Sequence, residues 1–357
     1  MNIRIEKTTT PAQKPDQTKL GFGRYFTDHM FLMDYSPDKG WHDARIVPFA
    51  NLTLHPAATV FHYGAEVFEG MKAYRRADGQ VQLFRPMENV RRLNTSAERL
   101  CLPQIDEQDA LEAIMKFVEF EQDWVPAEPG TSLYIRPFLF GSDEQLGLHT
   151  IQNALFVIIA SPVGSYYAAG INPVRIMIET EDVRAVKGGT GFTKCGGNYA
   201  ASNRAAARAE QKGYSQVLWL DGIHRKYIEE VGAMNVMFRI GDEIITPELS
   251  GSILPGITRK SCLDVLRAKG YTVTERQISV DELVEAMKNG TLKEAWGCGT
   301  AAVVSPIGEL AYGDMKYTVN NFEIGEVTHL LYDTLTGIQW GKTPDTYGWT
   351  VEIPSNN

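Results

Sequence analysis

The sequence is poor in cysteine, in long apolar runs and in positive charge. Its four cysteines include no CxxC pair, so a zinc site or a redox-active pair is not expected. The longest apolar run, residues 154–160, is far too short to span a bilayer. With 44 acidic and 35 basic residues the net charge is −9. This charge argues against a general nucleic-acid binder and, weakly, against binding to anionic membranes.

The N-terminal segment lacks the features of a targeting signal. Residues 1–20 are polar and contain Pro11 and Pro15, without the apolar core of a signal peptide or the arginines of a transit peptide. Cysteines scattered through a long chain suit a reducing compartment, so we expect the protein in the cytoplasm. A composition of 43% hydrophobic and 22% charged residues is typical of a globular enzyme, and 357 residues favour two domains.

The spacing of apolar residues predicts a first half in which helices and strands are grouped. Helical spacing occurs at 88–100 and 107–119. Runs rich in branched and aromatic residues predict strands at 31–33, 80–84, 133–140 and 154–160. Two prolines and two glycines without apolar periodicity mark 161–173 as a linker.

The second half alternates strands and helices. Strands are expected at 174–179 and 216–220, and a hairpin over 236–245 turns at Gly241-Asp242. Helices are expected at 198–212 and 258–269, each followed by a glycine. The pattern predicts an α+β domain followed by an α/β domain, with an N-terminal arm at 1–20, a first domain at 21–160, the linker at 161–173 and a second domain at 174–357.

Lys194 lies in the most informative segment of the chain. Residues 187–199 read Lys-Gly-Gly-Thr-Gly-Phe-Thr-Lys-Cys-Gly-Gly-Asn-Tyr, so five glycines surround one lysine just before a helix. Glycines let the backbone approach a ligand closely, and a lysine held there could form an imine with a carbonyl compound. A solvated lysine in a flexible loop would give the same pattern. The spacing does not match a Walker phosphate-binding loop.

Three further segments could contribute to a site. Leu254-Pro-Gly-Ile-Thr258 opens a helix whose N-terminus suits a phosphate, although an ordinary threonine cap would look the same. Trp296-Gly-Cys-Gly-Thr-Ala-Ala302 is either an anion-binding turn or a tight turn between strands. A glutamate in Tyr227-Ile-Glu-Glu-Val-Gly232 either points into a site or is solvated surface charge.

The order of these motifs resembles the branched-chain aminotransferases, which are pyridoxal 5′-phosphate (PLP) enzymes of fold type IV. The order is a lysine in glycine-rich sequence, Glu-Val-Gly-x-Met-Asn, Leu-Pro-Gly-x-x-Arg and Gly-x-Gly-Thr-Ala. The likeness extends upstream to residues 21–30, 68–73, 83–86, 99–103 and 132–137, and so covers nearly the whole chain after residue 20. It implies a two-domain, D-amino acid aminotransferase-like fold with a smaller N-terminal α+β domain and a larger, PLP-binding C-terminal α/β domain.

The resemblance implies cofactor-binding roles for particular residues. Lys194 matches the lysine that forms the Schiff base and moves the proton, Tyr199 the partner of the PLP O3′ oxygen, and Glu230 the carboxylate facing the pyridine nitrogen. Arg92 matches the phosphate-binding arginine, with neighbouring Arg91 as its rival. The rest of the phosphate cradle matches Gly256, Ile257, Thr258 and Thr300. No metal is expected.

The substrate-binding roles also follow from the resemblance. Thr300 and Ala301 match the groups that receive the α-carboxylate, and Arg136 matches the residue that helps to accept the distal carboxylate of glutamate. The side-chain pocket would be formed by Phe22, Tyr63, Phe68, Tyr134 and Tyr166. Each aromatic taken singly could equally be core packing, and Arg136 could form a surface ion pair worth little.

Two departures from the animal members of the family bear on regulation and tuning. Ala302 and Ser305 stand where those members carry a CxxC pair, so a thiol switch of that kind is not expected. Ala233 replaces a threonine in Glu-Val-Gly-Thr-Met-Asn, which removes a hydroxyl near the cofactor ring.

The expected activity is therefore ping-pong transamination between L-leucine, L-isoleucine or L-valine and 2-oxoglutarate in amino acid biosynthesis. The nearest rivals are D-amino acid aminotransferase and aminodeoxychorismate lyase, followed by a non-catalytic phosphate- or cofactor-binding protein and a structural interaction protein. The expected partners are amino acids and 2-oxo acids, without nucleic acid or membrane. The family likeness also implies a homodimer.

Overall fold

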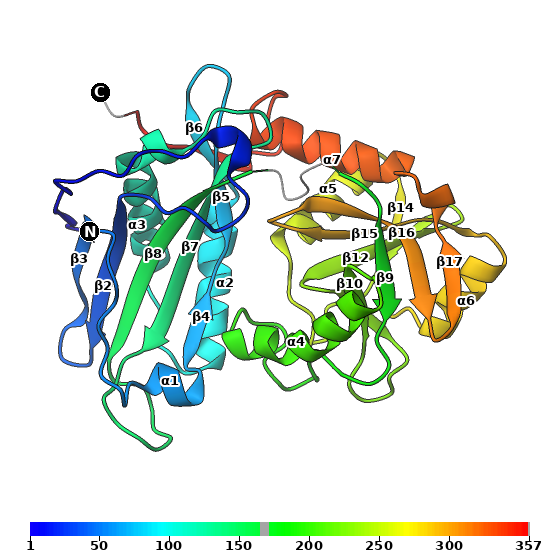
Figure 1. The fold of residues 1–357 in the computed structure, drawn as a ribbon, viewed down its shortest axis with the longest axis horizontal. Coiled ribbons are helices and arrows are strands. Elements are labelled where there is room, and N and C mark those ends of the chain that lie inside the picture. The colour runs from blue at the N-terminus through cyan, green and yellow to red at the C-terminus, as the bar shows by residue number, and fades with distance from the viewer. Residues whose placement is uncertain (165–170, 356–357) are drawn as a thin grey trace. The chain divides into compact units, whose positions relative to one another are not determined.

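The computed structural model describes residues 1–164 and 171–355. The chain forms two compact units, here called the first and second units (Figure 1). The first unit comprises Met1–Ala168, Thr193–Gly196 and Gly337–Asn357, and the second comprises Ala169–Phe192 and Gly197–Thr336. Among the described residues, no helix is both long enough and apolar enough to cross a membrane.

The first unit is built on a nine-stranded sheet against which α2 and α3 pack. The strand order is β1-β3-β2-β8-β7-β5-β6-β18, with β4 paired to β7. The strands are β1 (Arg4–Ile5), β2 (His29–Ser36), β3 (Gly40–Pro48), β4 (Glu66–Phe68), β5 (Met71–Arg75), β6 (Val81–Phe84), β7 (Ser132–Gly141), β8 (Ala154–Val163) and β18 (Thr350–Glu352). The helices are α1 (Thr59–Tyr63), α2 (Pro86–Arg99) and α3 (Glu107–Phe120), with 3-10 turns η1 (Gln17–Lys19) and η2 (Gln122–Trp124).

The helix signals in the sequence of the first unit are confirmed. Pro86 stands at the first position of α2, where its missing N–H costs nothing. The Asp106 side chain caps α3 by accepting hydrogen bonds from the N–H groups of Gln108 and Asp109. The apolar faces of both helices and of the sheet meet in one core that includes Phe31, Leu83, Leu93, Phe117 and Ile135.

The first unit differs from the expected boundaries in three places. The C-terminal segment from Gly337 belongs to it: β18 pairs with β6, and Gln82 Nε2 donates to the carbonyl of Ile338 at 2.9 Å. Ser161–Val163, expected in the linker, continues β8, with Pro162 opposite Leu133. Proline is tolerated there because β2 pairs with β8 only over Ala154–Ile158, so the missing N–H of Pro162 removes no hydrogen bond from the β2–β8 pairing. The N-terminal arm adds β1 to β3.

The second unit is a mixed sheet whose strands close into a ring. The strand order is β11-β10-β9-β16-β15-β12-β13-β14, β17 pairs with β16, and an additional β11–β12 pairing closes the ring. The strands are β9 (Val174–Ile178), β10 (Gln216–Leu220), β11 (Ile228–Val231), β12 (Met234–Ile240), β13 (Glu243–Thr246), β14 (Thr272–Glu275), β15 (Leu292–Gly299), β16 (Val303–Tyr312) and β17 (Met315–Thr318). The helices are α4 (Gly196–Gln211), α5 (Ile257–Ala268), α6 (Val280–Lys288) and α7 (Glu326–Gln339), with 3-10 turn η3 (Asn320–Phe322).

The ring brings together segments that lie far apart in the sequence. Glu230 on β11 is opposite Asn235 on β12, and Asn235 is in turn opposite Cys298 on β15. The β15–β16 hairpin that follows Cys298 carries Thr300 and Ala301 in its turn. Two of the motifs singled out in the sequence, Glu-Val-Gly-x-Met-Asn and Gly-x-Gly-Thr-Ala, therefore lie on neighbouring strands of the second unit.

Candidate active site

Lys194 is held in the first unit by backbone contacts on both sides. Its N–H donates to Ser96 Oγ at 3.0 Å, and its carbonyl accepts from the N–H of Phe68 at 2.9 Å. The Lys194 ammonium lies 4.8 Å from the centroid of the Phe68 ring. The Ser96 hydroxyl on α2 and the backbone of β4 thus fix where this side chain begins, and the aromatic ring fixes the surface along which it extends.

Glu66 fixes the chain two residues after Lys194. Its carboxylate accepts a hydrogen bond from the N–H of Gly196, the first residue of α4. A Cβ on Gly196 would stand 2.1 Å from Glu66 Oε1, so this close approach requires glycine. Burial raises the pKa of Glu66, an effect that the Gly196 hydrogen bond and the nearby Arg136 charge oppose.

Four of the predicted substrate-binding residues gather in the first unit. The Phe22 and Tyr134 rings pack edge to face with centroids 4.9 Å apart. The Arg136 guanidinium lies 4.6 Å from the Phe68 ring centroid, and its Nη2 donates to the Tyr134 hydroxyl at 3.1 Å. Buried Arg136 Nε has no hydrogen-bond partner among the described residues, so a donor remains for an anionic ligand.

Two pocket candidates remain. Tyr63 is part of α1 and is 41% exposed, and its hydroxyl accepts a hydrogen bond from the N–H of Gly147 at 2.7 Å. Tyr166 lies outside the described residues.

Arg92 and Arg91 have contrasting environments. The side chain of Arg92 is 8% exposed and forms a two-point pair with Glu69, Nε to Oε1 at 2.7 Å and Nη2 to Oε2 at 2.9 Å. Burial alone would raise the pKa of Glu69, but the Arg92 charge, helped by Lys194 and Asn89, outweighs it and lowers the pKa. The Arg91 side chain is 59% exposed, and its Nε lies 3.2 Å from Glu107 Oε2. This contrast favours Arg92 as the functional arginine.

In the second unit, Glu230 is a buried carboxylate with a charged partner. Arg184 Nε lies 2.9 Å from Glu230 Oε2, and both side chains are at most 8% exposed. Glu230 Oε1 accepts from the N–H of Leu254 at 2.7 Å. Arg184 Nη2 also donates to the carbonyls of Gly191 and Ser252. The Arg184 guanidinium therefore joins the glycine-rich segment, β11 and the loop before α5.

The loop before α5 positions a helix N-terminus. Asn235 Nδ2 donates to the Leu254 carbonyl at 2.9 Å, and a Cβ on Gly256 would stand 1.9 Å from Asn235 Oδ1. Gly256 is the N-cap of α5 and has no side chain that could accept a hydrogen bond from the N–H groups of the first helical turn, which begins with Ile257 and Thr258. Such a terminus suits a phosphate through its N–H donors and the helix dipole.

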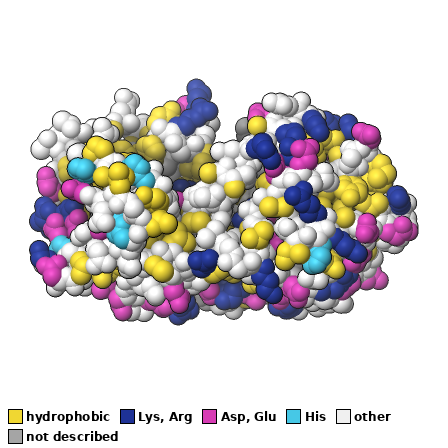
Figure 2. Space-filling view, turned by 90° about the horizontal axis from the view of Figure 1, so that it is seen from below, with side chains coloured by type: hydrophobic (Ala, Val, Ile, Leu, Met, Phe, Trp, Pro, Cys, Tyr) yellow, Lys and Arg dark blue, Asp and Glu magenta, His cyan; other side chains and the backbone are white. Residues whose placement is uncertain are grey.

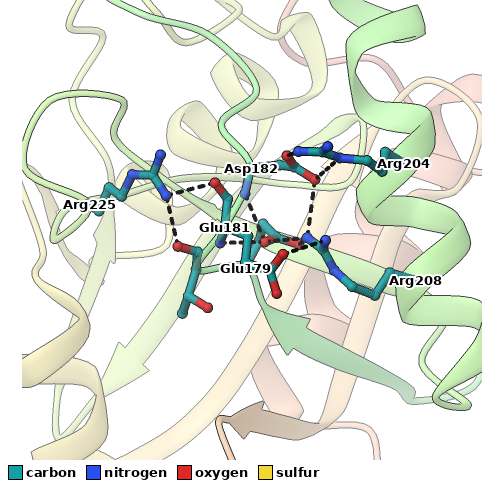
Figure 3. Close-up of polar contacts among 7 residues, drawn as sticks. Glu179, Glu181, Asp182, Arg204, Arg208 and Arg225 are labelled. Atoms are coloured by element: carbon teal, nitrogen blue, oxygen red, sulfur yellow. Dashed lines mark hydrogen bonds and ion pairs between the residues drawn. The ribbon is translucent and has the colours of Figure 1, made fainter.

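Tyr199 lies in the first turns of α4, the helix that follows Lys194. Downstream, α4 is anchored by an ion-pair network to residues 179–182 (Figure 3). Arg208 Nη2 lies 2.7 Å from both oxygens of buried Glu179, and Arg204 pairs with Asp182. The helix that carries Tyr199 is thus tied to the segment that follows β9.

The sequence patterns assigned no role to Arg184, Glu69 or Glu66. Arg184 and Glu69 each contact a predicted site residue, and Glu66 binds the segment that carries Lys194. Arg184 lies 46 positions before Glu230, and a pattern in a single chain does not reveal which arginine meets which carboxylate. Glu69 lies within residues 68–73, one of the segments that carry the family likeness, and directly follows β4. Alternation along an extended chain predicts that its side chain points to the face opposite Phe68.

Residues 66–310 match the family described as amino-transferase class IV. Branched-chain-amino-acid aminotransferase 2 of Bacillus subtilis (strain 168) is 56% identical over 351 residues, which cover 98% of this chain and 97% of the relative. The chain belongs to the class IV aminotransferases and, within them, to the branched-chain-amino-acid aminotransferases.

Solved structures of branched-chain amino acid aminotransferases share this fold. The enzyme of the thermophilic archaeon Thermoproteus uzoniensis, crystallised with norvaline, matches with a TM-score of 0.76 and 25% identity, over 91% of this chain and 100% of that one. The T.th. enzyme complexed with N-(5′-phosphopyridoxyl)-L-glutamate matches with a TM-score of 0.74 and 25% identity, over 94% of this chain and 99% of that one. The fold type IV assignment and the family resemblance read from the motifs are confirmed.

Proposed function

We propose that this chain is a PLP-dependent transaminase that moves the amino group between L-leucine, L-isoleucine or L-valine and 2-oxoglutarate. The observation that carries the proposal is Lys194, fixed at its backbone and lying beside the Phe68 ring, which Arg136 also contacts. The relatives' names support the substrate class. The structure of a relative with a phosphopyridoxyl-glutamate supports both the cofactor and a dicarboxylate co-substrate.

The donor set fits PLP. The uncapped N-terminus of α5, with Gly256, Ile257 and Thr258, would hold the phosphate together with Arg92 and Thr300. Glu230, kept as a hydrogen-bonded carboxylate partner by Arg184, would hold the proton on the pyridine nitrogen, and Tyr199 would bind O3′. PLP, when bound, supplies the electron sink, and the protein supplies orientation and electrostatics.

Lys194 would act as covalent anchor and as base. Its amine would bind the cofactor first and, once displaced by the substrate amine, would move a proton from the substrate Cα. This second task requires a neutral amine near pH 7, which positive groups nearby and exclusion of water favour. The hydrogen bonds to Ser96 and Phe68 fix the backbone from which the amine reaches out.

The substrate pocket would have an aromatic wall and one cation. Phe22, Phe68 and Tyr134 would accept the aliphatic side chain, and Tyr63 and Tyr166 would complete the wall. Arg136, with its free Nε donor, would bind the distal carboxylate of glutamate. Thr300 and Ala301 would receive the α-carboxylate through the turn after β15. A hydrophobic pocket separates a methylene by only about 1–3 kcal/mol, so all three branched-chain amino acids are expected substrates.

Borohydride reduction followed by peptide mapping tests the cofactor assignment. We expect one phosphopyridoxyl group per chain, on Lys194, and a visible absorption band that is absent in Lys194→Ala. Lys187, seven residues earlier in the same segment, is the internal control, and a label there would overturn the assignment.

Incubation with 2-oxoglutarate and either L-leucine or D-alanine tests the activity. Turnover of D-alanine alone would favour D-amino acid aminotransferase.

We further propose that the chain is a homodimer. Large apolar side chains of the first unit are exposed, including Phe61 at 61% and Leu148 at 85%. Hydrophobic and histidine side chains gather on the face of this unit seen in Figure 2. A monomer rarely leaves many such side chains in water, and a twofold interface would cover them. Light scattering on the eluting protein should give twice the chain mass of 39.8 kDa, and one chain mass would contradict the proposal.

A further inference from the structure

A cavity of about 480 Å³ lies in the second unit and contains none of the residues assigned above to PLP or substrate. It lies between the turn at 221–227, which joins β10 to β11, and the segment at 247–253, which follows β13. Ligand-binding cavities of proteins commonly have volumes of about 300–1,000 Å³, so this one is large enough for a small molecule.

The walls of the cavity are fixed by hydrogen bonds. The Asp221 carboxylate accepts from the N–H groups of Ile223, His224, Lys226 and Tyr227 at 2.7–3.1 Å. Arg225 Nη1 holds the same turn to the carbonyls of Thr180 and Glu181 (Figure 3). On the other side, Arg259 Nη2 donates to the Pro247 carbonyl at 2.9 Å. The cavity is therefore preformed.

Glu229 is the group in this cavity whose bonding is incomplete. It lies on β11, is 5% exposed, and its Oε1 accepts from Ser252 Oγ. Its Oε2 is buried and has no hydrogen-bond partner among the described residues. Burial raises the pKa of Glu229, and the Ser252 hydrogen bond and the Arg184 charge oppose this rise only in part. Asp221, by contrast, has both carboxylate oxygens engaged, so of these two buried or half-buried carboxylates only Glu229 has an oxygen that no described residue satisfies.

Apolar side chains also line the cavity. Ile223 is 68% exposed and Leu249 is 47% exposed, and both line the cavity together with Ile253 and Tyr227. A ligand that satisfied the Glu229 oxygen and covered these side chains would carry one cationic donor on an apolar body. We propose that this cavity binds a small primary amine with a branched aliphatic body, whose ammonium group donates to Glu229 Oε2.

Two kinds of molecule share this chemistry, free alkylamines and α-amino acids. An amino acid would bring a carboxylate as well, and Lys187 in the cavity lining is the cation available to it. The shared element is the ammonium–Glu229 contact, and binding experiments with both kinds of ligand distinguish the two sources.

The test uses borohydride-reduced holoenzyme, in which the aldehyde can no longer react with amines. Calorimetry would compare 3-methylbutylamine, the uncharged 3-methylbutan-1-ol of the same skeleton, and L-leucine. We expect the amine to bind at one site per chain, at least tenfold more tightly than the alcohol, and to weaken at least tenfold in Glu229→Gln. Glu248→Gln, which alters another carboxylate of the lining, should bind the amine like the natural protein.

Absence of saturable binding, or equal affinity in Glu229→Gln and the natural protein, would overturn the proposal. Tighter binding of L-leucine than of the amine would assign the site to amino acids, and the reverse to free amines. If Glu229→Gln does not fold, a crystal structure of the natural protein with the amine decides. Amine nitrogen within about 3.2 Å of Glu229 Oε2 supports the site, and an empty cavity overturns it.

Discussion

Arg184 and Glu230 form a buried ion pair, with Nε and Oε2 2.9 Å apart, between the segment after β9 and strand β11. The pair gives the buried Glu230 carboxylate a cationic partner from within the second unit. Glu230 is the acid proposed to face the PLP ring nitrogen, so Arg184 would set the charge that the cofactor meets. Arg184 would then be a positioning residue, acting on the cofactor through Glu230.

Arg184→Met should destabilise the protein strongly. Removing Arg184 takes the cationic partner from a buried carboxylate, which costs about 3–5 kcal/mol of the free energy of unfolding. Arg184→Lys should be intermediate, since it keeps the charge but not the planar donor set. Arg175→Met is the matched control: that arginine is 58% exposed, its Nε lies 3.9 Å from Glu309, and the expected change is below about 1 kcal/mol. Equal losses in urea unfolding of the two methionine variants would refute the role of burial.

Arg92→Met and Arg91→Met should separate the two candidate phosphate ligands. Arg92 is buried against Glu69, whereas Arg91 is exposed, so PLP affinity should fall at least tenfold in the first variant only. A charge-assisted hydrogen bond contributes about 1.5–3 kcal/mol, which sets the size of this effect. Absorbance titration of the apoenzymes with PLP measures it. A larger loss in Arg91→Met would move the phosphate contact by one residue, and Arg92→Lys tests whether charge alone restores binding.

The turn at Asp221 should give the protein an acid-sensitive step. Burial alone would raise the pKa of Asp221, but four backbone N–H donors outweigh it and lower the pKa from 3.8 to about 2. The folded state therefore holds this proton less tightly than the unfolded state. The resulting stability is present above about pH 4 and is lost as the pH falls toward 2.

Asp221→Asn should remove this stability at neutral pH and leave a flatter acid profile. The expected loss at pH 7 is about 1–2 kcal/mol, reduced from the full shift because the group is partly hydrated. Relative to the natural protein, the loss should shrink between pH 4 and pH 2. Asp242→Asn, in an exposed hairpin turn, is the control and should change neither quantity. A pH-independent difference between the Asp221 variant and the natural protein would rule out linkage to this carboxyl group.

The local patterns of the sequence predicted many elements well. The helices expected at 88–100, 107–119 and 258–269 correspond to α2, α3 and α5, and the hairpin turn at Gly241-Asp242 joins β12 to β13. These elements have amphipathic spacing, caps or turn residues that depend on near neighbours only. Such signals survive in a single sequence.

Non-local pairing was beyond the reach of these patterns. β9 pairs in parallel with β16, with Ile176 opposite Leu310, and β18 returns to β6 from the far end of the chain. Nothing near Ile176 or Thr350 in the sequence specifies these partners, because strand pairing depends on packing against neighbours that are distant in the sequence. For the same reason the motifs indicated Lys194 and Glu230 but not their neighbours Glu66 and Arg184.

Gly196 and Gly197 offer a last test, because they are adjacent in the Lys194 motif but differ in their surroundings. A Cβ at Gly196 would stand 2.1 Å from Glu66 Oε1, whereas a Cβ at Gly197 would meet no atom within 4 Å. Gly196→Ala must therefore displace the Glu66 side chain and lose the hydrogen bond that starts α4, at a cost of about 1–3 kcal/mol. Gly197→Ala should be neutral or stabilising by up to about 1 kcal/mol, since alanine favours a helix. Thermal unfolding of both variants measures the difference, and Gly196→Ala combined with Glu66→Ala should recover part of the loss. If Gly196→Ala were as stable as Gly197→Ala, Glu66 would not hold the start of α4.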